Sequence, residues 1–322
     1  MTSKNPEPKP LFVERMKKIL SEDKDFQDYI EILKTQPPKS LRVNKLKISP
    51  KELRKKLEDK GWKVNQIWPE YPEVMITENI LEPGEFGRSF EHLLGYYYIQ
   101  ELSSMLPVIA LQPEKNEFIL DLCAAPGSKT TQIASQMENT GTIIANEVNL
   151  GRIKILSSNL ERCGVTNTII TRKDAIALCK KLNNQGFKFD KILLDVPCSG
   201  EGTLRSTPKT YVMWNPKTIS NLSKLQKQIF KASLEILKKG GTIVYSTCTH
   251  APEENEGVVS EILNEFKDSI KIEEIKLPVK FREGIIKWEN QDYNPKVKKC
   301  ARIYPQDNDT EGFFLAKFTK IK

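Results

Sequence analysis

DLCAAPGSKTT, residues 121–131, indicates the architecture of this 322-residue chain more strongly than any other segment. It begins as the end of an apolar strand, passes through a turn of small residues and proline, and continues as a helix. A strand that turns directly into a helix is typical of the first ligand-binding turn of a doubly wound α/β sheet. The backbone N–H groups at the start of such a helix are free to bind an anion. We therefore expect this turn to hold part of a ligand.

The turn differs from the GxGxxG pattern, which lets the backbone approach a bulky pyrophosphate. Its small residues allow a ligand to come close, its proline stiffens the backbone, and its lysine adds a positive charge. These properties suit a small carboxylate, such as the methionine end of S-adenosylmethionine. The predicted cofactor loop comprises Cys123, Ala124, Ala125, Pro126, Gly127, Ser128 and Lys129. Within it, we expect Cys123 to matter for its size and packing rather than for its reactivity.

From residue 117 onward, strand-like and helix-like segments alternate. The predicted strands are 117–122, 142–147, 168–173, 191–196 and 242–247, and the main predicted helices are 128–137, 151–163, 217–239 and 254–266. Residues 312–320 alternate as a last strand, which we expect to be antiparallel. This pattern predicts a doubly wound, mostly parallel sheet whose ligands lie beyond the carboxyl ends of its strands.

Acidic residues follow three of the predicted strands: Glu147, Asp174 and Asp195. Glu147 lies 26 residues after Asp121, where an acidic side chain binds the two ribose hydroxyls of a nucleoside. Asp174 could accept a hydrogen bond from the adenine amino group. We include Arg152 in the predicted cofactor site as well. An acidic residue at a strand end, taken alone, is more often a turn or helix-cap residue, but three at successive strand ends favour a binding site.

Two cysteines lie in loops that follow predicted strands: Cys198 in DVPCSGEGT (195–203) and Cys248 in YSTCTHAPEENE (245–256). Such thiols suit covalent chemistry on an unreactive ring carbon. A thiolate that adds to one carbon of such a ring makes the neighbouring carbon nucleophilic toward a methyl donor. Asp195 could stabilise the adduct by hydrogen bonding to the ring. The residues alone do not decide which cysteine attacks. Asn255 and Glu256 are expected to cap the helix after Cys248.

Composition limits the possible classes of protein. The length fits two domains, no apolar run approaches the roughly 18 residues of a membrane span, and the N-terminus lacks a secretory signal, so we expect a cytoplasmic protein. Six scattered cysteines and two histidines give no metal-binding pattern. Residues 1–60 hold 16 Lys and Arg against 10 Asp and Glu, which is six of the eight net positive charges. This surplus suggests a nucleic-acid partner, although a lysine-rich solvated surface is an equal alternative.

Residues 1–110 are predicted to form a separate α+β domain, and residues 111–322 the sheet domain. Two short amphipathic helices (11–20 and 21–33) precede a strand (41–48) and a helix that Ser49 caps. Further strands near 62–68 and 73–77 give this domain the order of an RNA-recognition fold, without its aromatic signature. Residues 95–111 are expected to form a linking helix. The tyrosines at 96–98 are expected to pack in the core or to line the substrate cleft.

The segments quoted above, together with LRVNKLKIS (41–49), LLGYYYIQELSSMLP (93–107) and DTEGFFLAKF (309–318), resemble the RNA cytosine-5 methyltransferases of the NOL1/NOP2/Sun family. Archaeal tRNA-type members are the most similar. The resemblance implies a class I methyltransferase (Rossmann-like) fold, an N-terminal RNA-binding domain and S-adenosylmethionine as cofactor. It also implies that Cys248 attacks cytosine carbon 6 and that Cys198 assists product release.

Two residues differ from those that are usual in the motifs of this family. Ser128 stands where a second glycine is common, and Gln306 stands where relatives often carry histidine. The size favours tRNA over rRNA as the substrate, and we expect a monomer without a metal. One alternative is methylation of a base amino group, but DVPC is not the Asn/Asp-Pro-Pro-aromatic loop typical of that chemistry. The other is a catalytically retired RNA-binding or assembly factor, which intact thiols and an intact cofactor loop disfavour.

Overall fold

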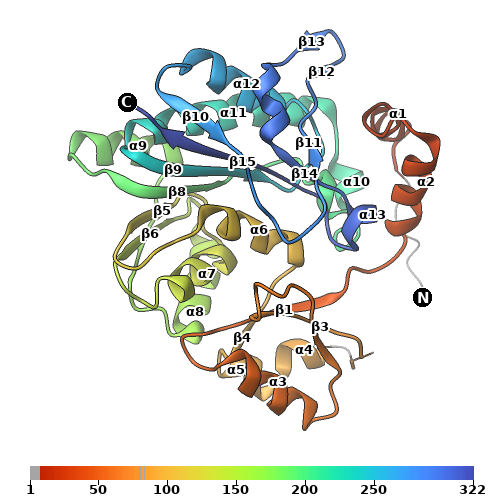
Figure 1. Cartoon of the computed structure of the whole chain (residues 1–322), viewed down its shortest axis with the longest axis vertical. Helices are drawn as coiled ribbons and strands as arrows, with labels where there is room; N and C mark the ends of the chain where they lie inside the picture. Colours follow the sequence, from red (N-terminus) through yellow and green to blue (C-terminus); the bar gives the residue numbers. More distant parts are fainter. Residues whose placement is uncertain (1–7, 80, 83) are drawn as a thin grey trace.

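The computed structural model describes residues 8–79, 81–82 and 84–322, and a nine-stranded sheet forms the centre of this part (Figure 1). Its strands are β5 (Phe118–Asp121), β6 (Thr142–Asn146), β7 (Thr168–Thr171), β8 (Phe189–Asp195), β9 (Leu237–Thr247), β10 (Ile270–Glu273), β11 (Arg282–Glu283), β14 (Ala301–Ile303) and β15 (Phe313–Lys320). They lie in the order β11-β14-β15-β9-β8-β5-β6-β7, and β10 also pairs with β15. Strands β5 to β9 are parallel to one another, and β15 is antiparallel to β9. The predicted sheet and its antiparallel last strand are confirmed.

Helices cover both faces of this sheet, as a doubly wound fold requires. The helices are α6 (Leu102–Leu111), α7 (Ser128–Gln136), α8 (Leu150–Cys163), α9 (Ala175–Asn184), α11 (Pro216–Glu235) and α12 (Glu256–Glu265). Apolar residues of α6 and α7 form one core with the sheet, and those of α9, α11 and α12 form a second core. The carboxyl ends of β5, β6, β8 and β9 therefore meet at one edge, between the two layers of helices.

A smaller four-stranded sheet lies beneath this domain in Figure 1. Its elements are β1 (Lys39–Val43), α3 (Pro50–Glu58), β2 (Val64–Gln66), β3 (Val74–Thr77), α4 (Glu85–Arg88), α5 (Phe90–Leu93) and β4 (Tyr97–Ile99). The antiparallel order β2-β3-β1-β4 with its interposed helices is that of an RNA-recognition fold, as predicted. Ser49 caps α3 through a capping box with Glu52, which confirms the predicted cap.

The prediction of one helix over residues 95–111 was wrong. Residues 97–99 form β4, which pairs with β1, and the helix begins only at Leu102. Tyr97 and Tyr98 are buried against neighbours far along the chain, so the tyrosines belong to the small sheet. The pairing of β4 with β1 spans more than fifty residues, and it overrides the local helical pattern of this segment.

Two N-terminal helices, α1 (Pro10–Ile19) and α2 (Asp23–Ile32), lie beside the large sheet domain rather than beside the small sheet (Figure 1). Phe12, Met16 and Tyr29 pack there against Trp214 and Tyr304. The helices confirm the predicted amphipathic pair. The predicted division at residue 110 stays a prediction, and its residues 1–7 lie outside the described part.

The remaining elements connect these layers. They are η1 (Glu201–Thr203), α10 (Thr210–Met213), β12 (Lys287–Trp288), β13 (Gln291–Asp292), η2 (Pro295–Lys299) and α13 (Pro305–Asn308). The helix predicted for 217–239 ends at Glu235, because Leu237 already pairs with Phe189 in the sheet. Among the described residues, no helix is long and apolar enough to cross a membrane.

Candidate active site

The predicted cofactor loop leads from the end of β5 to the start of α7. Gly127 immediately precedes α7 with a φ of +103°, a conformation that side-chain-bearing residues rarely adopt. A Cβ atom at this position would lie 2.9 Å from Cδ1 of Leu156. The Ala125–Pro126 peptide bond is cis. The loop therefore brings its backbone close to α8 and leaves the first N–H groups of α7 at the carboxyl edge of the sheet.

A buried aspartate at the base of this loop was not among the predicted site residues. Asp121 ends β5 and is 1% exposed, and its Oδ2 accepts a 2.6 Å hydrogen bond from Thr130. Its Oδ1 has no hydrogen-bond partner among the described residues. Burial raises the pKa of Asp121 to about 6. An unpaired carboxylate oxygen beside a helix N-terminus fits a ligand that carries both an ammonium and a carboxylate, as the methionine end of S-adenosylmethionine does.

The acidic residues at the next strand ends are placed differently from one another. Glu147 is 3% exposed, accepts a 2.8 Å hydrogen bond from the N–H of Asn149, and pairs with Arg152 at 3.0 Å. Arg152 also donates to the carbonyl of Ala125, so it ties this carboxylate to the cofactor loop. Asp174 is exposed and caps α9 through the N–H of Ala177. In this structure the carboxylate of Asp174 therefore acts as a helix cap, which was the alternative to a binding role.

Asp195 and Lys129 form an ion pair, with 2.6 Å between Oδ2 and Nζ. Ser246 donates a 2.8 Å hydrogen bond to the other carboxylate oxygen, and Ser104 contacts Nζ at 3.0 Å. Lys129 thus turns toward Asp195 and lies over the ring of Phe313. Its predicted contact with a cofactor carboxylate stays a prediction.

This ion pair opens onto a cavity of about 390 Å³ between the two sheets. The small sheet and its flanks contribute Pro37, Pro38, Lys39, Ser40, Phe86, Ile99 and Gln100. The large domain and its leading helix contribute Glu101, Ser103, Ser104, Lys129, Asp195, Val196, Thr203, Ser206, Cys248, Glu311 and Phe313. One of the two predicted cysteines, Cys248, thus lines the cavity, and Cys198 is not among the described residues that line it.

The two cysteines are in direct contact, with 3.2 Å between their Sγ atoms. The backbone N–H of Cys248 also points to Sγ of Cys198, at 3.3 Å. The hydrogen bond with Cys248, together with burial, raises the pKa of Cys198. Cys198 therefore keeps its proton and can donate it to the sulfur of Cys248.

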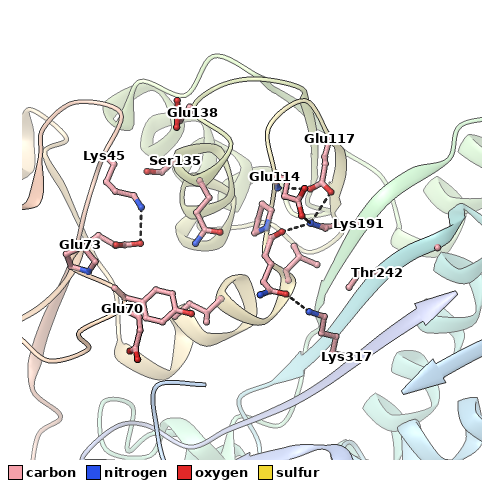
Figure 2. Close-up of a pocket in the computed structure, with 18 residues that line it drawn as sticks. Lys45, Glu70, Glu73, Glu114, Glu117, Ser135, Glu138, Lys191, Thr242 and Lys317 are labelled. Carbon is pink, nitrogen blue, oxygen red and sulfur yellow. Dashed lines mark hydrogen bonds and ion pairs between the residues drawn. The ribbon is translucent and has the colours of Figure 1, made fainter. Parts of the chain in front are cut away.

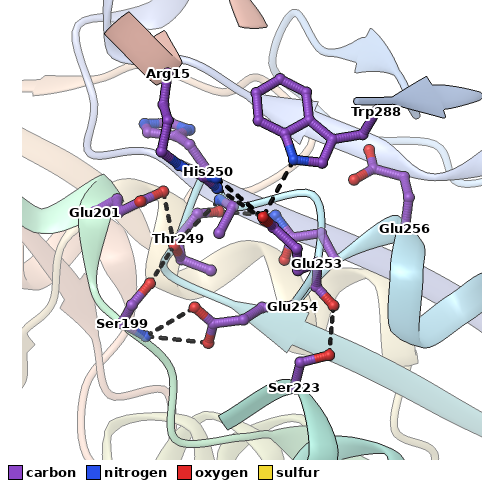
Figure 3. Close-up of polar contacts among 12 residues, drawn as sticks. Arg15, Ser199, Glu201, Ser223, Thr249, His250, Glu253, Glu254, Glu256 and Trp288 are labelled. Atoms are coloured by element: carbon purple, nitrogen blue, oxygen red, sulfur yellow. Dashed lines mark hydrogen bonds and ion pairs between the residues drawn. The ribbon is translucent and has the colours of Figure 1, made fainter. Parts of the chain in front are cut away.

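Polar contacts join the two cysteine loops, as Figure 3 shows. The hydroxyls of Ser199 and Thr249 lie 2.7 Å apart, and Thr249 also donates to Glu201 at 3.1 Å. The carboxylate of Glu254 accepts from the N–H of Ser199 at 3.1 Å and from Gln226 at 2.8 Å. These buried contacts fix the position of each thiol relative to the other.

Asn255 stands at the N-cap position of α12, as predicted, and its carbonyl accepts from the N–H of Val259. Asn255 precedes α12 but makes no side-chain cap; instead it contacts Thr247 at 2.6 Å and donates to the carbonyl of Thr249 at 2.9 Å. It therefore holds the loop on both sides of Cys248. Two neighbouring glutamates are neutralised by arginines: Glu253 by Arg15, and Glu256 by Arg302 (Figure 3 labels the first pair).

A larger cavity, of about 930 Å³, lies at the opposite ends of the strands (Figure 2). Its charged groups are largely paired with one another: Lys191 with Glu117 at 2.9 Å, and Lys45 with Glu73 at 3.2 Å. None of the predicted site residues lines it within the described ranges. The candidate active site is therefore the smaller cavity.

Two family models match the chain. The model of the 16S rRNA methyltransferase RsmB/F covers residues 108–319, and the model of the N-terminal domain of 16S rRNA methyltransferase RsmF covers residues 9–102. The chain belongs to the RsmB/F (Sun) family of RNA cytosine-5 methyltransferases. It is an RNA cytosine-5 methyltransferase, and the predicted family and enzyme class are confirmed.

The relatives of this chain have names that specify different RNAs. The chain is 42% identical over 308 residues to the tRNA (cytosine(49)-C(5))-methyltransferase of Pyrococcus abyssi, covering 96% of this chain and 95% of the relative. It is 37% identical over 312 residues to ribosomal RNA small subunit methyltransferase F of Aliivibrio salmonicida, of which it spans 63%.

Solved structures of related proteins superimpose on nearly the full length of the chain. A methyltransferase homologue from Pyrococcus horikoshii superimposes with a TM-score of 0.83 at 33% identity, over 96% of this chain and 94% of the homologue. NSun6 from the same organism, solved with the S-adenosylmethionine analogue SFG, gives 0.83 at 26% identity, over 98% of each chain. The class I methyltransferase fold with an additional N-terminal domain is thereby confirmed.

No cluster of three or more possible metal ligands occurs in the part of the chain that the structure describes. Gln306 donates a 2.9 Å hydrogen bond to Asp25 of α2. In this chain it therefore helps to attach the N-terminal helices.

Proposed function

We propose that this methyltransferase transfers a methyl group from S-adenosylmethionine to carbon 5 of specific cytosines in tRNA, through a covalent bond between Cys248 and cytosine carbon 6. The observation that carries the proposal is the placement of Cys248 in one cavity with Asp195 and Lys129. A flipped-out cytosine would there meet a thiol, a carboxylate and a cation at once.

The cofactor would be held at the carboxyl edge of β5 and β6. The N–H groups at the start of α7 and the unpaired Oδ1 of Asp121 suit its amino-acid end, and Glu147 suits its ribose. Asp174 and Arg152 remain proposed contacts of the adenosine side. When bound, S-adenosylmethionine supplies the electrophilic methyl group.

The chain's own residues would carry the remaining chemistry. The thiolate of Cys248 attacks carbon 6, and the pair of Asp195 and Lys129 faces ring nitrogen 3 and the amino group. Asp195 accepts a hydrogen bond from the amino group, and the positive charge of Lys129 offsets the negative charge that develops on the ring. Lys129 orients Asp195 through their 2.6 Å ion pair. Cys198, whose pKa is raised by its hydrogen bond to Cys248, assists release by stabilising the departing thiolate.

A tRNA substrate is supported by the Pyrococcus abyssi relative, which matches this chain almost from end to end, whereas the rRNA relative extends well beyond the match. The experiment is a transfer assay with radiolabelled S-adenosylmethionine and either tRNA or 16S rRNA transcripts, followed by mapping of 5-methylcytosine. We expect labelled tRNA, and we expect the Cys248→Ala variant to transfer no methyl group. Normal transfer by Cys248→Ala would refute the covalent route, and faster labelling of rRNA would refute the choice of RNA.

A further inference from the structure

Among the residues that the structure describes, three acidic side chains line the cavity that contains Cys248: Asp195, Glu101 and Glu311. In Asp195 both carboxylate oxygens are engaged, one by Lys129 and the other by Ser246. In Glu101 both are engaged as well: Oε1 accepts from the N–H of Glu311 at 2.9 Å, and Oε2 accepts from Ser103 and from the N–H of Ser104. Neither carboxylate is free to accept a proton from a substrate carbon without losing an existing partner.

Glu311 differs from these two residues. Its Oε1 accepts a 2.9 Å hydrogen bond from the N–H of Ser206, whereas its Oε2 is buried without a partner among the described residues. The side chain is 3% exposed, so water does not readily replace the missing partner. Burial raises the pKa of Glu311 to about 7, against the lowering effect of hydrogen bonding to Ser206 and with a smaller raising contribution from the charge of Glu101. A carboxylate that titrates near neutrality and has one free oxygen meets the requirements for a general base.

The backbone places Glu311 on the Cys248 side of the cavity. Phe314 of β15 pairs with Thr247 of β9, so the chain just before Phe314 runs alongside Cys248. Gly202 connects the two segments, because its N–H donates to the carbonyl of Cys248 at 2.9 Å and its carbonyl accepts from Gly312 at 2.8 Å. Glu311 and Phe313, two residues apart, both line the cavity.

We propose that Glu311 is a catalytic residue that removes the proton from carbon 5 of the methylated cytosine adduct, an inference that rests on the proposed covalent route. The proton passes from carbon 5 to Oε2 of Glu311. The electrons of the broken carbon–hydrogen bond form the carbon 5–carbon 6 double bond, and the carbon 6–sulfur bond breaks with its electron pair on Sγ of Cys248. The thiol of Cys198, 3.2 Å away, hydrogen-bonds the departing thiolate. Cys198 is the poorer base because it holds its own proton in that contact.

The test follows two labels in one reaction, with enzyme in excess over tRNA transcripts. The transcripts carry tritium on carbon 5 of cytosine, and S-adenosylmethionine carries a ¹⁴C-methyl group. The wild type should release one tritium for each methyl group transferred. Glu311→Gln keeps the acceptor for the N–H of Ser206 but cannot take the proton. It should therefore transfer methyl, accumulate the covalent adduct, and release tritium roughly 10²–10⁴ times more slowly.

Glu311→Asp, which retains a carboxylate, should release tritium faster than Glu311→Gln. Glu73→Gln, a buried glutamate that pairs with Lys45 outside the cavity, provides the matched control for loss of a buried carboxylate. The inference is overturned if Glu311→Gln releases tritium at the wild-type rate. It is also overturned if this variant neither transfers the ¹⁴C-methyl group nor releases tritium. Failure of the proposed function itself has a different signature: the wild type would transfer methyl without displacing tritium, or Cys248→Ala would retain both activities.

Discussion

The Sγ atoms of Cys198 and Cys248 lie 3.2 Å apart, although fifty residues separate the two cysteines in the chain. Each thiol is on a loop that follows a strand, and β8 and β9 are parallel neighbours. The hydroxyl contact between Ser199 and Thr249 joins the residues that directly follow the two thiols. The pair therefore results from sheet topology and from a local hydrogen bond, and it does not require a disulfide.

Replacing Cys198 by alanine should trap the enzyme on its RNA. The hydrogen bond to the departing sulfur is lost, so the adduct at Cys248 should form at a near-normal rate and break down slowly. A band of RNA-linked protein on a denaturing gel, together with one methyl group per enzyme and little turnover, would report this. Cys179→Ala, at a buried cysteine of α9, is the control and should show no such band. If Cys198→Ala forms no adduct, the roles assigned to the two thiols are wrong.

Asp195→Asn should lower kcat by about 10²–10³-fold, because the charged acceptor for the amino group of the base and the ionic partner of Lys129 are lost together. The affinity for S-adenosylmethionine, measured by calorimetry, should change much less. Asp190 lies on the same strand and pairs with Lys238 at the other end of the sheet, so Asp190→Asn provides a comparison. Equal losses of kcat in both variants would indicate a structural effect rather than a contact with the base.

Gly127→Ala should weaken both stability and cofactor binding. The positive φ alone should cost about 1–2 kcal/mol, and the new Cβ would also press on Leu156 at 2.9 Å. Gly186→Ala separates these effects, since Gly186 has a φ of +78° and a Cβ added there would meet no atom within 4 Å. Urea unfolding should show the larger loss for Gly127→Ala. Equal losses of stability in the two variants would mean that the contact with Leu156 adds no cost to a side chain at residue 127.

Glu256→Gln should be strongly destabilising. Glu256 and Arg302 form a buried pair at 2.7 Å, with side chains 0% and 3% exposed, and the variant leaves a buried guanidinium without its counter-charge. We expect a loss of about 3–5 kcal/mol in the free energy of unfolding. Glu58→Gln, which breaks the exposed pair with Arg54, should cost less than about 1 kcal/mol. Similar losses in urea titrations of the two variants would contradict this.

Glu254→Gln should change how stability depends on pH. Burial raises the pKa of Glu254 from 4.5 to about 7, so the folded state binds this proton more tightly than the unfolded chain does. The resulting stabilisation is complete below pH 4.5 and disappears as pH rises through 7. Relative to Glu254→Gln, the wild type should therefore lose about 3 kcal/mol between these limits. Unfolding titrations at several pH values would measure this difference, and a constant difference would disprove it.

The cofactor loop and the parallel strands could be predicted because their signals are local. In DLCAAPGSKTT the strand, the turn and the helix start are neighbours in sequence, and Gly127 does adopt the positive φ of a tight turn. The Ser49 capping box is equally local, with its partner three residues away. Both cysteines were found because each follows an apolar strand.

Contacts between distant segments could not be predicted in this way. Residues 97–99 are a strand only because β1 offers an edge to them, and the side chain of Asn255 binds the Cys248 loop rather than its own helix. Lys129 pairs with Asp195, which lies 66 residues later in the chain. Glu311 has one paired oxygen because the N–H of Ser206, far away in sequence, donates to it and to no other oxygen of that carboxylate. Charge and periodicity contain no information about such partners, which tertiary packing selects.

The helices α1 and α2 pack on residues that the ribosome makes much later, among them Trp214 and Tyr304. At roughly 5–20 residues per second, their apolar faces would wait on the order of tens of seconds for these partners. During synthesis this pair of helices therefore exposes apolar residues, and it can dock, with Arg15 paired to Glu253, only after Tyr304 has been made. A segment made before its partners thus reaches its final place only after those partners have been made.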